Sequence, residues 1–206
     1  MHIAIAGNIG SGKTTLTEML AKHYGWEPKY EAVDYNPYLE DYYKDIPRWS
    51  FNMEVFFLKE RFKDLLQLTR CSKQQTIVQD RTIYEGVYVF TKNNYKMGNM
   101  TERDFHTYME LFDSMTHILY YPDLMIYLKS GVSHLVKNIQ SRARDYEQQM
   151  PLAYLESLNE LYDDFIYNKY KGKVLVVDVN NIDYLHSKKD FSSIIDKIDA
   201  NLFGLF

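Results

Sequence analysis

The chain alternates between short apolar runs and longer stretches in which apolar side chains recur every three or four positions. Short runs indicate buried strands, and the periodic stretches indicate amphipathic helices. The strand-like runs are residues 2–6, 29–33, 76–80, 123–129 and 173–179. Strands that alternate with helices predict an α/β fold, a five-stranded parallel sheet with helices on both faces.

Two of the stretches between these runs have a clear helical period. Residues 49–68 carry one apolar stripe, and the stretch around residues 105–119 shows the same spacing. The stripe consists of Phe51, Val55, Leu58, Phe62 and Leu65. No linker, repeat or low-complexity tract interrupts the alternation, so we expect a single domain over residues 1–206. In such sheets ligands bind at the carboxyl ends of the strands.

A glycine-rich loop, GNIGSGKTT, follows the first apolar run and precedes a helical pattern. It fits the phosphate-binding pattern GxxxxGK[ST], and strand, loop and helix come in the required order. Backbone N–H groups of such a loop surround an anion, with help from the helix N-terminus. Lys13 is expected to reach the β- and γ-phosphates, and the Thr14 hydroxyl a magnesium ion. The predicted nucleoside triphosphate site consists of Gly7, Asn8, Ile9, Gly10, Ser11, Gly12, Lys13, Thr14 and Thr15.

Composition and charge exclude several classes of protein. A net charge of -4 and a pI near 5.9 argue against a general nucleic-acid binder, which needs a basic surface. The single cysteine, Cys71, cannot form an internal disulfide, as is typical of the reducing cytoplasm. No apolar run approaches the roughly 18 residues of a membrane span. We therefore expect a cytoplasmic protein that binds neither nucleic acid nor membrane.

Charged residues stand near the ends of three predicted strands. Glu31 lies near the end of the second run, Asp80 and Arg81 end the third, and Arg142 and Arg144 follow the fourth in a helical segment. Each has a simpler interpretation, as a solvated acid, a helix N-cap or an exposed charged face. Together they match phosphoryl transfer to a hydroxyl, which needs a carboxylate to deprotonate the acceptor and cations to neutralise the phosphoryl group. The paired arginines could close over the phosphates as a lid that excludes water.

Five segments in this order resemble the deoxynucleoside kinases related to deoxycytidine and deoxyguanosine kinase, particularly the bacterial deoxyadenosine and deoxyguanosine kinases. The segments are GNIGSGKTT, YEAVDYNPYLEDYY, RWSFNMEVFFLKERF, QDRTIYEGVYVF and NIQSRARDYEQ. The resemblance spans residue 2 to about residue 180. It implies a kinase that uses ATP and Mg²⁺ to phosphorylate a 5′-hydroxyl, with a lid at about residues 138–150. It also implies a homodimer.

The resemblance assigns roles near the reacting atoms. Glu31 matches the general base for the 5′-hydroxyl, and Arg81 matches the arginine that positions that base and the phosphoryl group. Asp80 stands where the family has an acid near magnesium. Arg142 and Arg144 match the lid arginines.

On the nucleoside side, Tyr43 and Glu147 match a pair that hydrogen-bonds the 3′-hydroxyl of the sugar. Trp49 and Phe90 match aromatic residues that line the base pocket. A largely apolar nucleoside needs such an aromatic slot with a few polar groups.

The sequence departs from its relatives at Glu54, where many have a glutamine that reads the base. Glu54 and Arg61 are seven residues apart on one helix, so both should point to the same side. A carboxylate only accepts hydrogen bonds, which suits the N1–H and 2-amino donors of guanine, while arginine suits O6 and N7. Adenine would present its N1 lone pair to the carboxylate unless a proton or water intervened. We therefore expect a purine substrate, deoxyguanosine ahead of deoxyadenosine; alternatively Glu54 pairs with Arg61 or solvent.

Two further departures concern the recognition of the base and the arginines of the lid. Gly86 stands where cytidine-preferring relatives carry an acid beside the arginine, which argues against cytidine. Asn138 stands where a lid arginine is often found, so the lid is expected to work with two arginines.

Other functions remain open at this point. A nucleoside monophosphate kinase such as thymidylate kinase shares the loop, the aspartate-arginine step and the lid, but would need cations where Glu31 stands. A GTP-driven switch is disfavoured because NKYKG, residues 168–172, has no aspartate after its lysine. A catalytically silent partner subunit would bind nucleotides without turnover. A deoxynucleoside triphosphate feedback inhibitor is suggested by resemblance alone, and residues 180–190 form either a loop over the donor adenine or a plain connection.

Overall fold

In the computed structural model, residues 1–31, 35–70, 75–117, 119–142 and 150–204 are described. Five strands form one parallel sheet in the order β2-β3-β1-β4-β5. The strands are β1 (His2–Gly7), β2 (Glu27–Lys29), β3 (Ile77–Asp80), β4 (Leu124–Lys129) and β5 (Val174–Asp178). The five-stranded parallel sheet predicted from the apolar runs is confirmed.

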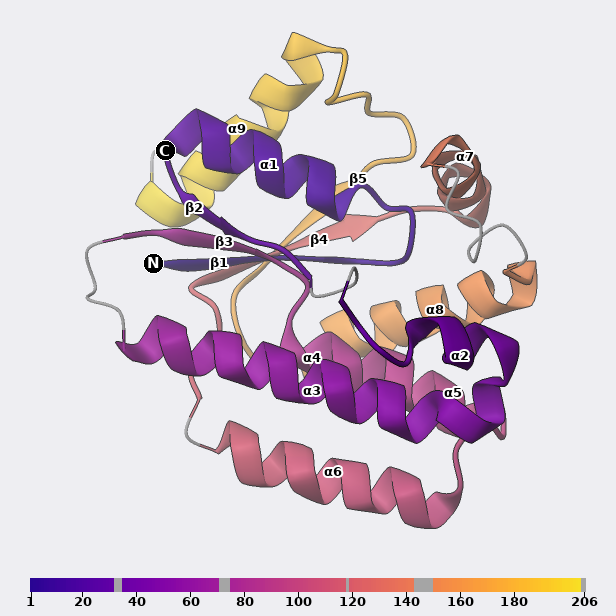
Figure 1. The fold of residues 1–206 in the computed structure, drawn as a ribbon. Helices are drawn as coiled ribbons and strands as arrows, with labels where there is room; N and C mark the ends of the chain where they lie inside the picture. Colours follow the sequence, from indigo (N-terminus) through magenta and orange to yellow (C-terminus); the bar gives the residue numbers. More distant parts are fainter. Residues whose placement is uncertain (32–34, 71–74, 118, 143–149, 205–206) are drawn as a thin grey trace.

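Helices connect the strands and cover both faces of the sheet (Figure 1). The helices are α1 (Lys13–Tyr24), α2 (Leu39–Lys44), α3 (Ile46–Arg70), α4 (Ile83–Glu85), α5 (Lys92–Lys96), α6 (Glu102–Thr116), α7 (Val132–Arg142), α8 (Leu152–Asp164) and α9 (Lys188–Phe203). Two π-helical turns, η1 (Gly86–Thr91) and η3 (Phe165–Lys169), continue α4 and α8. The predicted helices at residues 49–68 and 105–119 correspond to α3 and α6.

The alternating side chains of the central strands build two cores. Ile3 and Ile5 of β1 pack with α1 and α9 on one face, whereas Met125 and Tyr127 of β4 pack with α3, α4 and α8 on the other. Figure 1 shows α1 and α9 on one side of the sheet and α3, α4 and α8 on the opposite side, with α6 outside α3. Because both faces are covered, the carboxyl edge of the sheet is the place where loops can form a site.

The second strand differs from its prediction. The apolar run at residues 29–33 was expected to form it, but β2 covers Glu27–Lys29 and pairs with β3 through Glu27–Ile77, Pro28–Val78 and Lys29–Gln79. β2 is an edge strand, so its half-exposed side chains need not be apolar, and an edge position tolerates a proline without an N–H donor. Over the described residues, hydrophobic periodicity therefore placed this strand a few residues too late, and residues 32–33 of the predicted run lie outside the described part of the chain.

Within the described residues, no helix combines the length and apolar character needed to cross a membrane. The predicted lid falls mostly outside the described part of the chain, which includes Arg142 at the end of α7 but not residues 143–149. The fold thus provides a rigid sheet edge where residues after β1, β2 and β3 meet.

Candidate active site

The loop between β1 and α1 has the geometry of a phosphate cradle. Gly12, just before α1, has φ 91°. The Tyr184 hydroxyl donates to the Gly12 carbonyl at 3.0 Å, and a Cβ at position 12 would lie only 2.0 Å from that hydroxyl. The positive φ and the nearby hydroxyl both exclude a side chain at position 12, which explains the glycine. The loop can therefore wrap closely around an anion.

Two neighbouring helices fix this loop. Asn8 donates from Nδ2 to the Leu155 carbonyl at 2.9 Å and to Asn159 Oδ1 at 2.7 Å, both on α8. Asn138 of α7 donates from Nδ2 to the Gly10 carbonyl at 2.8 Å. The residue that departs from the lid arginine pattern thus ties α7 to the phosphate loop.

Lys13, the lysine of the loop motif, is buried at the start of α1. Its ammonium group donates to the Asn8 carbonyl at 2.9 Å. Burial, followed by the nearby Arg81 guanidinium, lowers the pKa of Lys13 to about 8. A phosphate group close to this ammonium would favour its charged form.

Thr14 and Asp80 form a site suited to magnesium. The Thr14 hydroxyl donates to Asp80 Oδ2 at 2.5 Å, while the buried Oδ1 of Asp80 has no hydrogen-bond partner. Burial raises the pKa of Asp80, and the adjacent Lys13 opposes this effect. An orphaned carboxylate oxygen beside a hydroxyl and a phosphate loop fits a hard cation that prefers oxygen ligands and retains water. Among described residues no group of three or more metal-ligating side chains occurs, so phosphates would have to complete such a site.

Arg81, directly after β3, adopts a left-handed backbone conformation with φ 68°. This conformation costs a non-glycine residue about 1 kcal/mol or more. The backbone N–H of Arg81 donates to the Ile5 carbonyl at 3.0 Å. A capping box between Thr82 and Glu85 begins the next helix, α4. Glu85 is fully buried and accepts hydrogen bonds from Thr82 N at 2.7 Å and from the Tyr162 hydroxyl at 2.8 Å. These contacts hold the strained turn.

Glu31 lies between two arginines. Arg61 Nη2 pairs with one carboxylate oxygen of Glu31, and Arg81 Nε lies 3.2 Å from the other. Burial raises the pKa of Glu31, but Arg81, Arg61 and Lys13 together outweigh burial, so the pKa lies below its ordinary value. Glu31 is therefore an ionised carboxylate at neutral pH. A carboxylate held in this way can accept a proton from a hydroxyl group placed beside it.

A cavity of about 460 Å³ joins these groups, within the range of roughly 300–1,000 Å³ for small-molecule sites. Its walls include Lys13, Thr14, Glu31, Tyr43, Glu54, Arg61, Asp80, Arg81, Phe90 and Arg142. The Arg81 guanidinium lies 4.3 Å from the centre of the Phe90 ring. Trp49, by contrast, is not among the lining residues; it packs near Tyr38, with the Arg48 guanidinium 4.7 Å from its ring centre.

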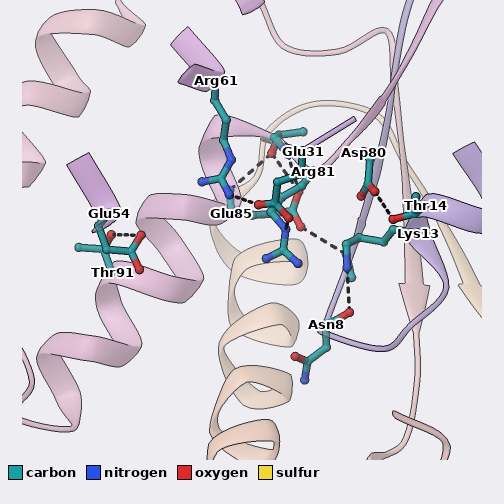
Figure 2. A network of polar contacts seen from close by, with 12 residues as sticks. Asn8, Lys13, Thr14, Glu31, Glu54, Arg61, Asp80, Arg81, Glu85 and Thr91 are labelled. Carbon is teal, nitrogen blue, oxygen red and sulfur yellow. Dashed lines mark hydrogen bonds and ion pairs between the residues drawn. The ribbon is translucent and has the colours of Figure 1, made fainter. Parts of the chain in front are cut away.

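Glu54 lies at the end of the site remote from the phosphate loop. In Figure 2, Glu54 with Thr91 and Asp80 with Thr14 stand at opposite ends, and Glu31 lies between them. Glu54 accepts hydrogen bonds from Thr91 Oγ1 at 3.2 Å and from Asn94 Nδ2 at 3.0 Å. The alternative pairing of Glu54 with Arg61 is therefore not observed in the described part of the chain, where Arg61 pairs with Glu31.

Gly86 leaves room for the Arg61 side chain. A Cβ at position 86 would lie 2.8 Å from Arg61 Nη1 and 3.3 Å from the Tyr108 hydroxyl. The glycine noted in the sequence thus permits the approach of Arg61 to Glu31.

Sequence reasoning missed several residues of the site. Thr91, Asn94, Tyr42 and Tyr154 surround Glu54, and no local pattern distinguishes them from other polar or aromatic residues. Glu85 was readable in principle, because T-x-x-E is the capping-box pattern. Arg144 and Glu147 lie outside the described residues.

A second cavity, of about 780 Å³, opens on the other side of the phosphate loop. Residues of the loop and of α7 line it together with Asn180, Asn181, Asp183, Tyr184 and His186. The segment at residues 180–190 therefore faces the phosphate loop, as a loop over a donor nucleotide would.

The chain is similar in sequence to proteins of one known family. The family model for deoxynucleoside kinase matches residues 3–203. A deoxyadenosine/deoxycytidine kinase of Bacillus subtilis (strain 168) is 37% identical over 198 residues, covering 95% of this chain and 90% of the relative. A deoxyguanosine kinase of the same organism is 33% identical and covers 93% of each chain.

Solved structures agree with these sequence matches. The structure of deoxyadenosine kinase from M. mycoides with bound dATP matches with a TM-score of 0.85 at 32% identity, covering 97% of this chain and 100% of the other. Both the sequence and the fold thus match one family over nearly their whole length. The chain belongs to the deoxynucleoside kinase family.

Proposed function

We propose that this protein transfers the γ-phosphoryl group of ATP to the 5′-hydroxyl of a purine 2′-deoxynucleoside, with deoxyguanosine ahead of deoxyadenosine. The observation that carries the proposal is the ionised Glu31 carboxylate, held by two arginines in a cavity that runs from the phosphate loop to Glu54. Family membership favours this function over a nucleoside monophosphate kinase or a silent partner subunit.

The arrangement supports a specific division of labour. Glu31 removes the proton of the 5′-hydroxyl while that oxygen bonds to the γ-phosphorus, and the bond from the γ-phosphorus to the bridging oxygen breaks, which releases ADP. Lys13 and Arg81 offset the negative charge of the transferring group. Thr14 and Asp80 would hold magnesium, which, when bound, neutralises phosphate charge. Arg142, with Arg144 by resemblance, would act from the lid.

The nucleoside end has a matching set of groups. Phe90 and Tyr43 line the cavity beside Glu31, and Glu54 and Arg61 offer an acceptor and a donor to the base edge. The 3′-hydroxyl contact of Tyr43 with Glu147, and a base contact of Trp49, rest on resemblance alone. Trp49 is not among the residues that line the cavity.

Regulation, assembly and location belong to the same proposal. The M. mycoides deoxyadenosine kinase has been solved with bound dATP and with bound dCTP, which supports feedback inhibition by a deoxynucleoside triphosphate here. The proposed assembly is a homodimer, which light scattering with size-exclusion chromatography would test. The proposed location is the cytoplasm.

A magnesium-ATP assay tests the proposed reaction. Deoxyguanosine, deoxyadenosine, deoxycytidine and thymidine are offered in parallel, with the corresponding monophosphates as competing acceptors and the surface variant E110Q as control. We expect purine deoxynucleosides to turn over fastest, with 5′-monophosphates as products. Turnover of monophosphates alone would assign the neighbouring kinase activity instead, and no turnover would support the silent-partner function.

A further inference from the structure

Glu54 is a buried acid at the base end of the cavity. Its side chain is 2% exposed, and it lines the same cavity as Glu31. The two groups that bond its oxygens, the Thr91 hydroxyl and the Asn94 amide, are neutral donors. Neither donor depends on the charge of Glu54, because a carboxyl oxygen and a carboxylate oxygen both accept hydrogen bonds.

The Asn94 amide has a partner at each end. The Tyr42 hydroxyl donates to Asn94 Oδ1 at 3.1 Å, and Nδ2 of the same amide donates to Glu54 Oε1 at 3.0 Å. Asn94 therefore holds one oxygen of Glu54 and Thr91 holds the other, and each oxygen keeps a further lone pair for a ligand. This contact pins the position of the group without fixing its protonation state.

The charged and titratable groups around Glu54 lie on α2, α3, α6 and α8 and directly after β3. Arg61 on α3 and Arg81 after β3 are the nearby cations, and both pair with Glu31. The remaining groups are the phenols of Tyr42 on α2, Tyr108 on α6 and Tyr154 on α8, whose pKa values are raised by burial. Among described residues, Glu54 thus has no ion pair. Burial accordingly raises the pKa of Glu54 to about 7, against the opposing effect of Arg61.

The two forms of such a group present different hydrogen-bonding edges. A carboxylate presents two acceptors, and a neutral carboxyl presents one donor and one acceptor. The Watson–Crick edge of guanine offers two adjacent donors, N1–H and the 2-amino group. The same edge of adenine offers the N1 acceptor beside the 6-amino donor. The carboxylate is therefore complementary to guanine, and the carboxyl to adenine.

We propose that Glu54 reads the purine base in two protonation states, the carboxylate selecting deoxyguanosine and the neutral carboxyl selecting deoxyadenosine, with Asn94 as its positioning residue. The inference rests on the proposed function and names what determines the base. It makes one site serve both purines, with a ranking that depends on pH near neutrality.

The ratio of kcat/KM for deoxyguanosine to kcat/KM for deoxyadenosine, measured from about pH 6 to about pH 8, tests this inference. Effects of pH on Lys13, Glu31 and ATP are common to both substrates and cancel in the ratio. We expect the ratio to rise at least tenfold over this range, against a limit of about a hundredfold if each form bound a single base. A ratio that stays constant while turnover continues would overturn the inference and leave the proposed function intact.

The variant E54Q supplies a matched control. Glutamine has the shape of glutamate and, like the neutral carboxyl, presents a donor and an acceptor, but it does not titrate in this range. We expect E54Q to favour deoxyadenosine at every pH, with a flat ratio. N94L should move the pH at which the ratio changes, since it removes a hydrogen bond to Glu54, whereas the exposed E110Q variant on α6 should leave the profile unchanged. A pH-dependent ratio retained in E54Q would overturn the inference.

A binding measurement makes the test independent of turnover. Calorimetry near pH 7 in buffers of different ionisation enthalpy counts the protons exchanged on binding. Binding of deoxyadenosine should take up a fraction of a proton, and binding of deoxyguanosine should release a fraction of a proton. Neither exchange should occur with E54Q. Equal proton exchange for the two nucleosides would contradict the proposal even if the protein showed no kinase activity.

Discussion

Glu31 and Glu54 stand in one cavity, are both largely buried, and yet have different pKa values. The pKa of Glu31 lies below its ordinary value, whereas the pKa of Glu54 is raised to about 7. Burial raises both values, and the difference comes from the cations, since Arg61 and Arg81 both pair with Glu31. Two residues of the same type thus acquire different pKa values, which suits the proposed proton acceptor at one end of the cavity and the proposed titratable base reader at the other.

The largest effect is expected from E31Q. The amide keeps the shape of Glu31 but cannot take the proton of the 5′-hydroxyl, so kcat should fall by about 10²- to 10⁴-fold with little change in KM. Steady-state kinetics at saturating ATP measures this loss. A decrease of less than about tenfold would exclude Glu31 as the general base.

A third buried acid, Glu85, sharpens the comparison because groups of the protein itself bond both of its oxygens. Its oxygens accept hydrogen bonds from Thr82 N, the Tyr162 hydroxyl and, at 3.4 Å, Gly7 N. E85Q directs an NH₂ group at one of these donors, so it should lower the free energy of unfolding by about 2–4 kcal/mol. Urea unfolding measures the change. A neutral result would mean that the strained turn at Arg81 does not depend on Glu85.

The stability of E54Q should depend on pH in a defined direction. Because the pKa of Glu54 is higher in the folded chain than in the unfolded chain, the folded state binds more protons between the two values, and wild type loses stability as pH rises through them. Glutamine does not titrate. The free energy of unfolding of E54Q should therefore increase by about 1–3 kcal/mol relative to that of wild type as the pH rises from about 4 to about 8. A constant difference in urea unfolding across this range, as expected for E110Q, would contradict the assignment.

The smallest effect concerns the link between α7 and the phosphate loop. N138A removes the hydrogen bond to the Gly10 carbonyl, which should raise KM for ATP by about two- to tenfold, a loss of about 0.5–1.5 kcal/mol. S133A, on an exposed face of the same helix, provides the control. Equal KM values for the two variants would show that Asn138 does not support the loop.

Local patterns in the sequence predicted much of this molecule. The sheet could be predicted because its central strands are apolar on both faces. The loop at residues 7–15 could be predicted because a backbone that surrounds a phosphate needs glycines, and a lysine is needed to reach the phosphates. β2 was misplaced because an edge strand needs no apolar side chains. Lys13, Thr14, Glu31, Asp80 and Arg81 do converge at one edge of the sheet, as the strand ends suggested.

The surroundings of Glu54 could not be predicted in the same way. Thr91 ends a π-helical turn and Asn94 lies on the following helix, so their approach to α3 depends on tertiary packing. One interpretation of the sequence paired Glu54 with Arg61. In the structure Arg61 contacts Glu31 instead, and this leaves Glu54 without an ion pair among the described residues.

The contrast between the two acids can be measured directly by carbon-13 NMR of the protein labelled in its glutamate carboxyl groups, with E31Q and E54Q assigning the two signals. The account predicts that the Glu54 signal titrates near pH 7 while the Glu31 signal titrates below the ordinary glutamate value. Titration of both signals at the ordinary glutamate value would contradict it.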